Sequence, residues 1–311
     1  MELSSRLIVV TGPTASGKTR RAVSLARRLD GEIISADSRQ VYRDMDLGTG
    51  KDMEEYGDTP VHLIDICPAG YKYNLYEYLR DYRSAYGKIV SRGHRPILCG
   101  GTGLYVESVL KGLSLPEVPE NPELRASLRG LTLQQLTERL AAMKSLHNTT
   151  DVDTVQRAIR AIEIQTYYLQ HPEAAVEAKP HPLTDALVIG VEVDRDTRRR
   201  RISQRLTSRL EAGMIDEVAR LLESGVAPDD LIYYGLEYKY LTLYLTGRLS
   251  LSEMTSQLEI AIHQFAKRQM TWFRGMERRT GLPIHWLPST MGDDEFNEAV
   301  IDLLTTDGRT S

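Results

Sequence analysis

Cysteine is nearly absent from this chain of 311 residues, in which only Cys67 and Cys99 occur. Their spacing fits neither a metal-ligand motif nor a redox-active pair, so the sequence indicates no zinc centre and no thiol chemistry. We expect two buried thiols in a reducing compartment.

Long apolar runs are missing as well. The run near the N-terminus covers only Leu7 to Val10, which is too short for the apolar region of a signal peptide. No stretch approaches the roughly 18 consecutive apolar residues that a membrane span requires. We therefore expect a soluble, cytoplasmic protein with no membrane partner.

The chain also lacks a large excess of one charge. Its formal net charge of −4 argues against broad, nonspecific binding of nucleic acid. The basic residues are unevenly distributed, however, because seven arginines lie between Arg195 and Arg209 and five more basic residues lie in "AKRQMTWFRGMERR". A mildly acidic protein with such clusters can still carry a basic face.

Short apolar strands alternate with helical patterns along most of the chain. The first strand, "RLIVV", leads into a Gly-rich loop and then into apolar residues at helical spacing. This alternation predicts an α/β fold with a mostly parallel sheet flanked by helices. Further strands are expected at "EIISA" from Glu32, "VHLIDI" from Val61, "PILC" from Pro96, "ALVIGVEV" from Ala186 and "IHWL" from Ile284.

The middle of the chain differs, since it shows no convincing strand. We expect an all-helical insertion at residues 113–182 and a core formed by residues 1–112 and 183–311, whose C-terminal part is also helical. Ser250 and Glu253 fit a capping box at the start of one C-terminal helix. Two apolar stripes predict helices in the insertion: Leu133, Leu136, Leu140 and Met143, and Val152, Val155, Ile159 and Ile162.

The segment "TGPTASGKTR" matches the pattern G-x-x-x-x-G-K-[ST] in full, with Gly12, Gly17, Lys18 and Thr19 at the fixed positions. In such a loop backbone N–H groups surround phosphate oxygens, and the following helix adds partial positive charge. We expect Lys18 to reach the terminal phosphate and the Thr19 hydroxyl to bind Mg²⁺. The flanking strand and helix argue against a chance match.

Two further features bear on whether this loop serves a triphosphate. Asp65, in "VHLIDI", is an imperfect match to the acidic Mg²⁺ partner of a nucleoside triphosphatase, and Arg198 to Arg201 could form the lid of a nucleotide kinase. By themselves these residues leave open a P-loop kinase or another phosphate-handling enzyme.

A carboxylate follows the second predicted strand, in "ADSRQVYRDMDLGTGKD". Asp37 lies where the carboxyl ends of strands face the ligand crevice of an open α/β sheet. It is placed to act as a base or as a hydrogen-bond acceptor for a substrate amine or hydroxyl. A turn cap is an equal alternative, because Asp-Ser is common in that role.

Six segments occur in the order and approximate spacing of one family: "GPTASGKT", "ISADSRQVYRDMDLGTGK", "HLIDI", "GGTGLY", "QRAIRAIE" and "AKRQMTWFRG". By these motifs the chain resembles the tRNA dimethylallyltransferases from Ile8 to about Trp286. The resemblance implies a P-loop core with a helical insertion that grips the anticodon stem-loop of tRNA. It also implies transfer of the dimethylallyl group from dimethylallyl diphosphate to N6 of an adenosine beside the anticodon.

No triphosphate is cleaved in that reaction, and the loop holds the diphosphate leaving group with Mg²⁺ on Thr19. The resemblance implies that Asp37 takes the proton of the amine and that Thr102 lies near the reacting base. We expect a monomeric enzyme. The diphosphate would be bound by Gly12, Pro13, Thr14, Ala15, Ser16, Gly17, Lys18, Thr19 and Arg201. The tRNA would be bound by Asp37, Ser38, Arg39, Gln40, Thr102, Arg125, Gln156, Arg157, Ala158, Ile159 and Arg160.

Several residues also have a structural interpretation. Thr102 could cap the helix expected from Leu104. Gln156, Arg157 and Arg160 fall on an arc away from the apolar stripe, which suits a solvated helix face as well as RNA. Trp272 and Phe273 are expected in the core.

The sequence departs from the family pattern at several positions. Arg39 replaces the common Met, "GTGKD" replaces "GTAKP", and "YYGLEYKYL" only loosely follows a Gly-Tyr-Lys pattern. Three other functions stay open. They are prenyl transfer to a free adenine nucleotide, which would not need the insertion, a small-molecule P-loop kinase, and a nucleotide-gated RNA-binding module, which would not need Asp37.

Overall fold

The protein folds into two compact units in this computed structural model, which describes residues 6–145 and 150–307. One unit comprises Met1–Lys111 and Pro182–Ser311, and the other comprises Gly112–His181. These limits differ by one residue from those expected from the sequence. Among the described residues, no helix is both long and apolar enough to cross a membrane.

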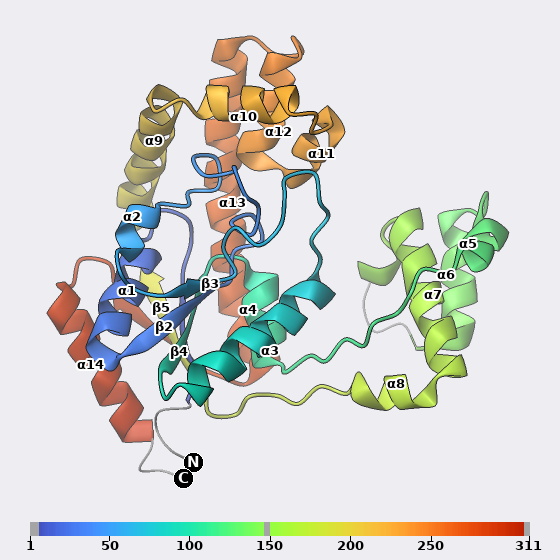
Figure 1. The fold of residues 1–311 in the computed structure, drawn as a ribbon, viewed down its shortest axis with the longest axis horizontal. Coiled ribbons are helices and arrows are strands. Elements are labelled where there is room, and N and C mark those ends of the chain that lie inside the picture. Colours follow the sequence, from blue (N-terminus) through green and yellow to red (C-terminus); the bar gives the residue numbers. More distant parts are fainter. Residues whose placement is uncertain (1–5, 146–149, 308–311) are drawn as a thin grey trace. The chain divides into compact units, whose positions relative to one another are not determined.

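Parallel strands form the centre of the first unit (Figure 1). Over the described residues, six strands pair in the order β3-β2-β4-β1-β5-β6, and each neighbouring pair is parallel. Most are short apolar runs buried on both faces, the pattern that favours parallel pairing. The predicted α/β fold is therefore confirmed. The strands are β1 (Ile8–Thr11), β2 (Gly31–Ser35), β3 (Val61–His62), β4 (Arg95–Gly100), β5 (Leu187–Glu192) and β6 (Ile284–Pro288).

The third strand is much shorter than expected. Only Val61 and His62 belong to it, whereas the sequence predicts a strand through "VHLIDI". The chain leaves the sheet because Leu63 and Asp65 have φ angles of 66° and 56°, which a strand does not allow. Asp65 forms an ion pair with the buried ammonium of Lys51. This pairing removes Asp65 as the acidic Mg²⁺ partner.

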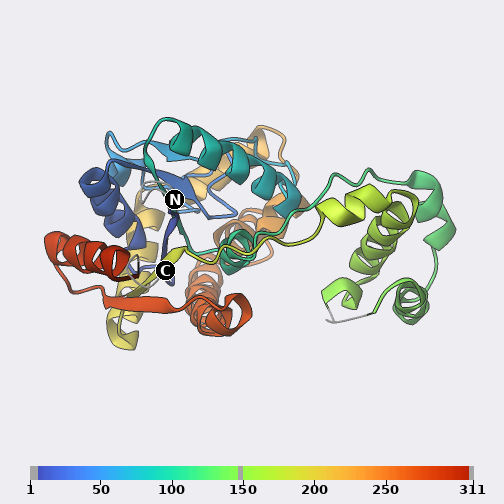
Figure 2. The same cartoon turned by 90° about the horizontal axis from the view of Figure 1, so that it is seen from below.

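Helices cover both faces of the sheet. Helices α1 and α14 pack on the face that contains Ile8, Val10 and Ile33, and they lie side by side in Figures 1 and 2. The alternate residues, such as Val9 and Ile34, face the side where α3 packs. The helices of this unit are α1 (Lys18–Leu29), α2 (Met53–Tyr56), α3 (Leu75–Ser91), α4 (Gly103–Leu110), α9 (Arg195–Glu211), α10 (Met214–Glu223), α11 (Pro228–Tyr234), α12 (Leu236–Leu245), α13 (Leu251–Thr280) and α14 (Asp293–Asp307).

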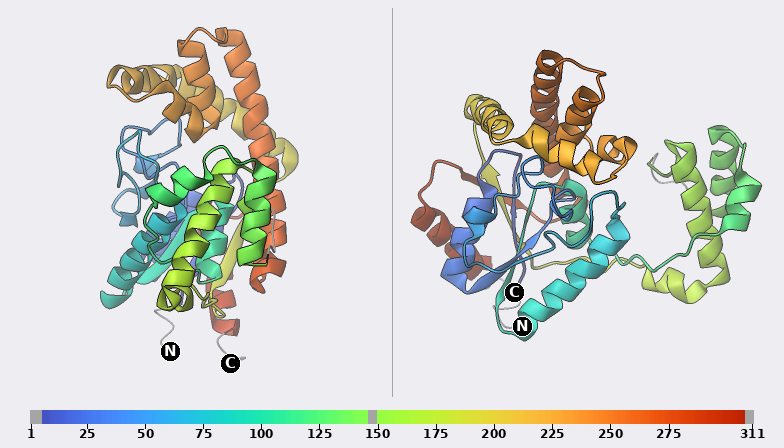
Figure 3. Two further views of the ribbon diagram at one scale, coloured as in Figure 1. Left: turned by 90° about the vertical axis from the view of Figure 1, so that its right-hand side faces the viewer. Right: turned by 45° about the horizontal axis from the view of Figure 1, so that its top comes forward.

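A second hydrophobic core lies among the helices α9 to α13. Met254, Leu258 and Ile262 of α13 are buried in it, as their spacing predicts. The Ser250 side chain accepts the Glu253 N–H, and the Glu253 side chain accepts the Ser250 N–H, so the predicted capping box is confirmed. Helices α12 and α13 lie side by side (Figure 3). This helical part supplies one wall of the pocket described below.

The insertion is helical and has no strand over its described residues. Leu136 and Leu140 of α6 pack against Ala158 and Ile162 of α7, so both predicted helices are confirmed. Val155 is exposed rather than on the apolar stripe, because it is the first residue of α7 and the buried face begins one turn later. The elements are α5 (Pro122–Leu128), α6 (Leu133–Met143), a 3₁₀ turn (Thr150–Val152), α7 (Val155–Gln170) and α8 (Pro172–Glu177).

Candidate active site

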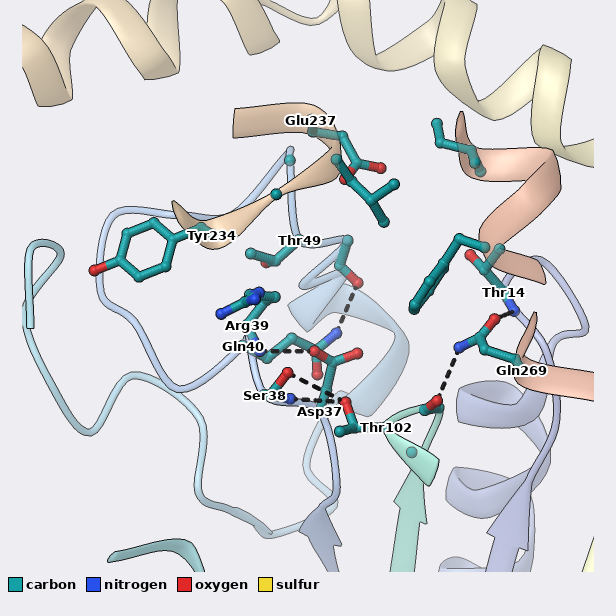
Figure 4. Close-up of a pocket in the computed structure, with 18 of the residues that line it drawn as sticks. Thr14, Asp37, Ser38, Arg39, Gln40, Thr49, Thr102, Tyr234, Glu237 and Gln269 are labelled. Atoms are coloured by element: carbon teal, nitrogen blue, oxygen red, sulfur yellow. Dashed lines mark hydrogen bonds between the residues drawn. The ribbon is translucent and has the colours of Figure 1, made fainter. Parts of the chain in front are cut away.

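Three loops that carry the sequence motifs meet at one edge of the sheet. Strands β2, β4 and β1 are consecutive neighbours, so the loops that follow their carboxyl ends lie together. These loops are "GPTASG" after β1, "ADSRQ" after β2 and "GT" after β4. With residues of α9, α12 and α13 they line a pocket of about 680 Å³ (Figure 4).

The loop between β1 and α1 presents hydrogen-bond donors that have no acceptor in the part of the chain that the structure describes. Gly17 is the N-cap of α1, so the N–H groups of Lys18 and Thr19 have no acceptor within the helix. The Ser16 hydroxyl is buried and has no hydrogen-bond partner among the described residues. An unpaired buried hydroxyl calls for an explanation, and a bound ligand supplies one. This loop is therefore built to receive an anion.

Lys18 extends from the start of α1 toward the end of β4. A Cβ atom on Gly101 would lie 2.6 Å from the Gln269 Nε2 and 3.4 Å from the Lys18 Nζ, so the ammonium lies next to this glycine, whose missing side chain makes room for the Gln269 amide. Burial lowers the pKa of Lys18 below the ordinary lysine value, and the nearby Asp37 raises it in part. A desolvated ammonium attracts an anion more strongly than an exposed one.

The residues at the start of α1 also fit a Mg²⁺ ion. The Thr19 side chain lies beside Tyr56 and lines the pocket with a hydroxyl oxygen, a donor type that Mg²⁺ accepts. Among the described residues, no group of three or more His, Cys, Asp or Glu side chains could hold a metal ion. Mg²⁺ commonly takes one or two protein oxygens together with substrate phosphates and water. Thr19, which lines the pocket, supplies one such oxygen.

Asp37 begins the loop after β2 and uses one carboxylate oxygen for the backbone. Its Oδ1 accepts the N–H of Arg39 at 2.9 Å, so the turn-cap interpretation is correct for this oxygen. Its Oδ2 accepts no hydrogen bond from the described residues. The side chain is half-buried and lies beside Ser38 and Thr102 (Figure 4). One oxygen fixes the carboxylate, and the other remains for a substrate hydrogen.

Thr102 is the N-cap residue of α4, but its hydroxyl does not cap that helix. The Thr102 Oγ1 accepts the backbone N–H of Ser38 at 3.0 Å and donates to the Ser38 Oγ at 3.4 Å. These bonds join the loop after β4 to the loop after β2 (Figure 4). The simple helix-cap alternative for Thr102 is therefore wrong.

The remaining residues of the loop after β2 line the same pocket. The Gln40 Nε2 donates to the Gly50 carbonyl at 3.1 Å, and its Oε1 accepts from Ser35 at 3.3 Å. The Arg39 guanidinium lies 5.6 Å from the centre of the Tyr234 ring, a cation–π arrangement. Arg39, which stands where the family pattern has Met, thus contacts an aromatic ring.

The arginine-rich segment forms α9, and its members have different surroundings. The Arg201 Nη1 lies 3.5 Å from the Ala15 carbonyl, at the phosphate loop. Arg199 and Arg200 are exposed. Arg205 and Arg209 line the pocket. Helix α9 therefore faces solvent on one side and forms part of the pocket wall on another.

Gln269 is a site residue that the sequence reasoning missed. Its Oε1 accepts the N–H of Thr14 at 2.8 Å, and its Nε2 donates to the Gly101 carbonyl at 2.9 Å (Figure 4). It therefore connects the phosphate loop to the loop after β4 through a buried amide. The motif "AKRQMTWFRG" contains Gln269, but helical spacing alone could not show that two loops from distant strands approach its amide.

We expect Gln269→Leu to weaken diphosphate binding by about tenfold and to lower the free energy of unfolding by about 1–3 kcal/mol, because Thr14 N–H and Gly101 C=O lose buried partners. Isothermal titration with inorganic diphosphate and urea unfolding measure the two effects. Gln257→Leu, at an exposed position of the same helix, is the control. Equal diphosphate affinity in both variants would show that Gln269 does not shape the loop.

Trp272 lies on the surface, contrary to the expectation that it belongs to the core. Its side chain is 40% exposed and lines the pocket. Its ring lies over Gly103, where a Cβ atom would be 2.3 Å from it, and Arg279 lies 5.2 Å from the ring centre. Phe273, its neighbour, is fully buried as expected. Consecutive helix positions face directions about 100° apart, so the two aromatic residues have opposite surroundings.

Two arginines of the insertion converge on one buried carboxylate. Glu163 accepts the Arg125 Nε and Nη2 at 3.0 Å each, and it also accepts from Arg160 and from the Asn121 N–H. Burial alone would raise the pKa of Glu163, but these donors hold it below its usual value. The two arginines are therefore held in one place, with their outer faces half-exposed.

The other insertion residues assigned to RNA lie on α7. Gln156 and Arg157 are exposed, and Arg157 forms an ion pair with Asp153. Ile159 is half-buried, and Ala158 is fully buried against α6. The Ala158 side chain is thus a packing residue in this structure, because helical spacing turns it away from Gln156 and Arg157 toward the core.

A family model described as IPP transferase matches residues 40–276, and a second, described as isopentenyl transferase, matches residues 5–59. The first match covers most of the chain. The chain belongs to the IPP transferase family. The phosphate loop falls in the second match, and the residues of α9, α12 and α13 that line the pocket fall in the first.

Relatives in this family are similar over nearly their full length. The tRNA dimethylallyltransferase 1 of Parabacteroides distasonis is 60% identical over 296 residues, which cover 94% of this chain and 95% of that protein. The tRNA dimethylallyltransferase 1 of Porphyromonas gingivalis is 60% identical over 306 residues, which cover 97% of this chain and all of that protein.

Solved structures of related proteins have the same fold. The tRNA isopentenylpyrophosphate transferase of Bacillus halodurans is 30% identical, with a TM-score of 0.72 over 98% of each chain. A eukaryotic dimethylallyltransferase acting on tRNA is 22% identical, with a TM-score of 0.79 over 97% of this chain and 80% of that one. The second likeness shows the fold alone.

Proposed function

We propose that this protein is a tRNA dimethylallyltransferase that moves the dimethylallyl group from dimethylallyl diphosphate to N6 of an adenosine beside the anticodon and releases diphosphate. One observation carries the proposal: an anion-binding loop and a carboxylate with an unused oxygen, Asp37, line a single pocket. The 60% identity to tRNA dimethylallyltransferases supports the choice of substrate.

The chemistry requires both parts of this pocket. The exocyclic amine of adenine is a poor nucleophile, because its lone pair is delocalised into the ring. The allylic carbon–oxygen bond can ionise early, so positive charge develops on the allyl group and negative charge on the leaving diphosphate. Lys18 and the N–H groups at the start of α1 stabilise that negative charge. Asp37 accepts the proton that the amine loses when the new carbon–nitrogen bond forms.

Mg²⁺ is the cofactor we propose. Thr19 would hold it together with phosphate oxygens and water, as the hydroxyl oxygen fits its preference. When bound, the ion supplies further neutralisation of the diphosphate charge. Two further side chains hold the loops of the pocket in place: Thr102 bonds to the loop that contains Ser38, and Gln269 bonds to the phosphate loop.

The substrate adenosine must leave the stack of the anticodon loop before its amine can react. Bases of single-stranded loops can be splayed out and bound at their edges. Ser38, Arg39 and Gln40 line the pocket beside Asp37 and offer polar groups for such an edge. The insertion offers Arg125 and Arg160 for the RNA backbone. We expect the enzyme to act as a cytoplasmic monomer.

A transfer assay tests this proposal. The protein is incubated with Mg²⁺, dimethylallyl diphosphate labelled in its prenyl group, and either unmodified tRNA or AMP. We expect label in tRNA and none in AMP. Label in AMP would indicate a transferase for free nucleotides. ATP turnover without any prenyl transfer would indicate a P-loop kinase, and binding of tRNA without any reaction would indicate an RNA-binding module.

We expect Glu163→Gln to weaken tRNA binding by about tenfold, because the released Arg125 and Arg160 must be ordered again when RNA binds. The KM for dimethylallyl diphosphate should stay unchanged, since Glu163 lies in the other unit. Filter binding and initial rates measure these constants. Glu120→Gln removes the exposed partner of Arg125 and should change tRNA affinity little. Equal effects of the two variants would argue against this role of Glu163.

A further inference from the structure

Two arginines of α9 approach the same glycine of the pocket wall. Arg205 Nη2 lies 3.5 Å from the Gly50 carbonyl oxygen. A Cβ atom on Gly50 would lie 2.3 Å from the Arg205 Nη2 and 2.5 Å from the Arg209 Nη2, so both guanidinium ends would have to shift. Gly50 also has a φ angle of 68°, which favours glycine. The absence of a side chain at residue 50 therefore leaves room for both guanidinium groups where they lie.

In the described part of the chain, a single carboxylate contacts both guanidinium groups of this pair. Asp52 is the carboxylate that contacts both guanidinium groups, at 2.8 Å from Arg205 and at 3.3 Å from Arg209. The Asp52 side chain is 49% exposed, whereas the Arg209 side chain is only 13% exposed. One exposed carboxylate thus serves two cations, one of which is largely removed from water. Such an arrangement costs free energy unless an anion completes it.

The pKa shifts agree with an incomplete site. Burial, and then the like charge of Arg205, lower the pKa of Arg209 below the ordinary arginine value. Burial raises the pKa of Glu237, and the attraction of both arginines lowers it in part, so Glu237 is a further charged neighbour of the pair. The positive charge of Arg205 also lowers the pKa of Lys18, so Arg205 and the phosphate loop lie near one another.

We propose that Arg209, beside Arg205, binds the diphosphate of the prenyl donor at the pocket wall formed by α9, and that Gly50, which has no side chain, leaves room for it. This inference rests on the proposed function for the identity of the donor. All of these residues line the pocket that holds Lys18. The guanidinium groups would form charge-assisted hydrogen bonds with phosphate oxygens, which are stronger than hydrogen bonds between neutral groups.

The departures from the family pattern converge on this arginine. Gly50 and Asp52 belong to "GTGKD", where the common pattern has "GTAKP", and Glu237 belongs to the altered "YYGLEYKYL". The structure brings these three positions together around Arg209. An alanine at residue 50 would displace both guanidinium groups, and a proline at residue 52 could not pair with them. The three departures thus have one common consequence, a second cation at the pocket wall.

A structural lock between α9 and the loop is the competing explanation, but this loop is already fixed by other residues. Glu217 accepts the N–H groups of Asp46, Leu47 and Gly48 at 2.9, 2.7 and 3.1 Å. The buried Lys51 ammonium bonds to the Tyr42 carbonyl at 2.8 Å and also pairs with Asp46. A weak 3.3 Å contact from Arg209 adds little to these bonds.

Titration with inorganic diphosphate in the presence of Mg²⁺ tests the inference on the full chain. We expect Arg209→Met to raise the Kd for diphosphate about tenfold or more, and to raise the KM for dimethylallyl diphosphate in parallel, while the Kd for tRNA stays within about twofold. Arg200→Met removes the same charge from an exposed position of α9 and is the control. A diphosphate Kd equal to that of the control would overturn the inference.

A second variant separates anion binding from a lock and serves if Arg209→Met does not fold. Asp52→Asn removes the carboxylate but keeps both arginines, so diphosphate should bind as tightly as in the unaltered protein or more tightly. If the ion pair only locks the loop, Asp52→Asn should weaken diphosphate binding. The proposed function can fail separately. If the unaltered protein transfers no prenyl group but Arg209→Met still binds diphosphate more weakly, the anion site stands and its natural ligand is another diphosphate.

Discussion

Asp37→Asn is expected to lower kcat about 10²–10⁴-fold, the range typical for loss of a positioned general base. The amide keeps an oxygen that can accept the Arg39 N–H, so the turn after β2 should persist. It cannot take the proton of the adenosine amine. Single-turnover transfer of labelled prenyl groups to tRNA measures the chemical step.

The Kd for tRNA should remain within about threefold of its original value in this variant, because the other polar groups of the loop are unchanged. Ser38→Ala is the matched control, since it removes one neighbouring hydroxyl that accepts from Thr102 and leaves the carboxylate. A single-turnover rate in Asp37→Asn close to that of Ser38→Ala would show that another group accepts the proton.

Lys18→Ala is expected to lower kcat/KM for dimethylallyl diphosphate by about 10²–10³-fold, an effect similar to removal of one donor from an oxyanion site. The ammonium lies at the phosphate loop with its charge desolvated, so no water can replace it fully. Initial rates at saturating tRNA measure the loss. If high concentrations of the donor restored the rate, Lys18 would contribute to binding of the donor and not to the chemical step.

The pH dependence of diphosphate affinity provides a control for this role. Burial lowers the pKa of Lys18 below the ordinary lysine value. The binding form is the protonated one, so affinity is full below that pKa and falls as the pH rises through it, earlier than for an ordinary lysine. Lys18→Arg keeps its charge over this range and should remove the fall. A pH profile identical in both proteins would assign the titration to another group.

The sheet and the order of its motifs could be predicted because the signals are local. Apolar runs such as "RLIVV" identify buried strands, and a loop that follows a strand lies at its carboxyl end. Glycines and acidic residues in those loops, such as Gly17 and Asp37, therefore predict a ligand site at one edge of the sheet. The exception, β3, ends early because Leu63 takes a positive φ, and no residue type in "VHLIDI" signals that.

The residues that sequence reasoning missed depend on contacts between distant segments. Gln269 bonds to Thr14 and to Gly101, which precede it by 255 and 168 residues. Trp272 is exposed and Phe273 is buried, although both belong to one motif. Tertiary packing decides these directions, and helical periodicity limits them only to a face.

Arg209 illustrates the same limit from the side of charge. The sequence shows seven arginines between residues 195 and 209, and a solvated helix is the common outcome for such a run. Its burial against Gly50 and Asp52 follows from the path of a loop more than 150 residues away in sequence. The departures "GTGKD" and "YYGLEYKYL" were visible, but their common neighbour was not.

The central claim is that the loop "TGPTASGKTR" holds a diphosphate that is left behind rather than a triphosphate that is cleaved. The most direct measurement counts products after reaction with tRNA, Mg²⁺, dimethylallyl diphosphate and ATP together. We predict one diphosphate released for each dimethylallyladenosine found by mass spectrometry of the tRNA nucleosides, with ATP intact. Hydrolysis of ATP, or diphosphate release without prenylated adenosine, would contradict the claim.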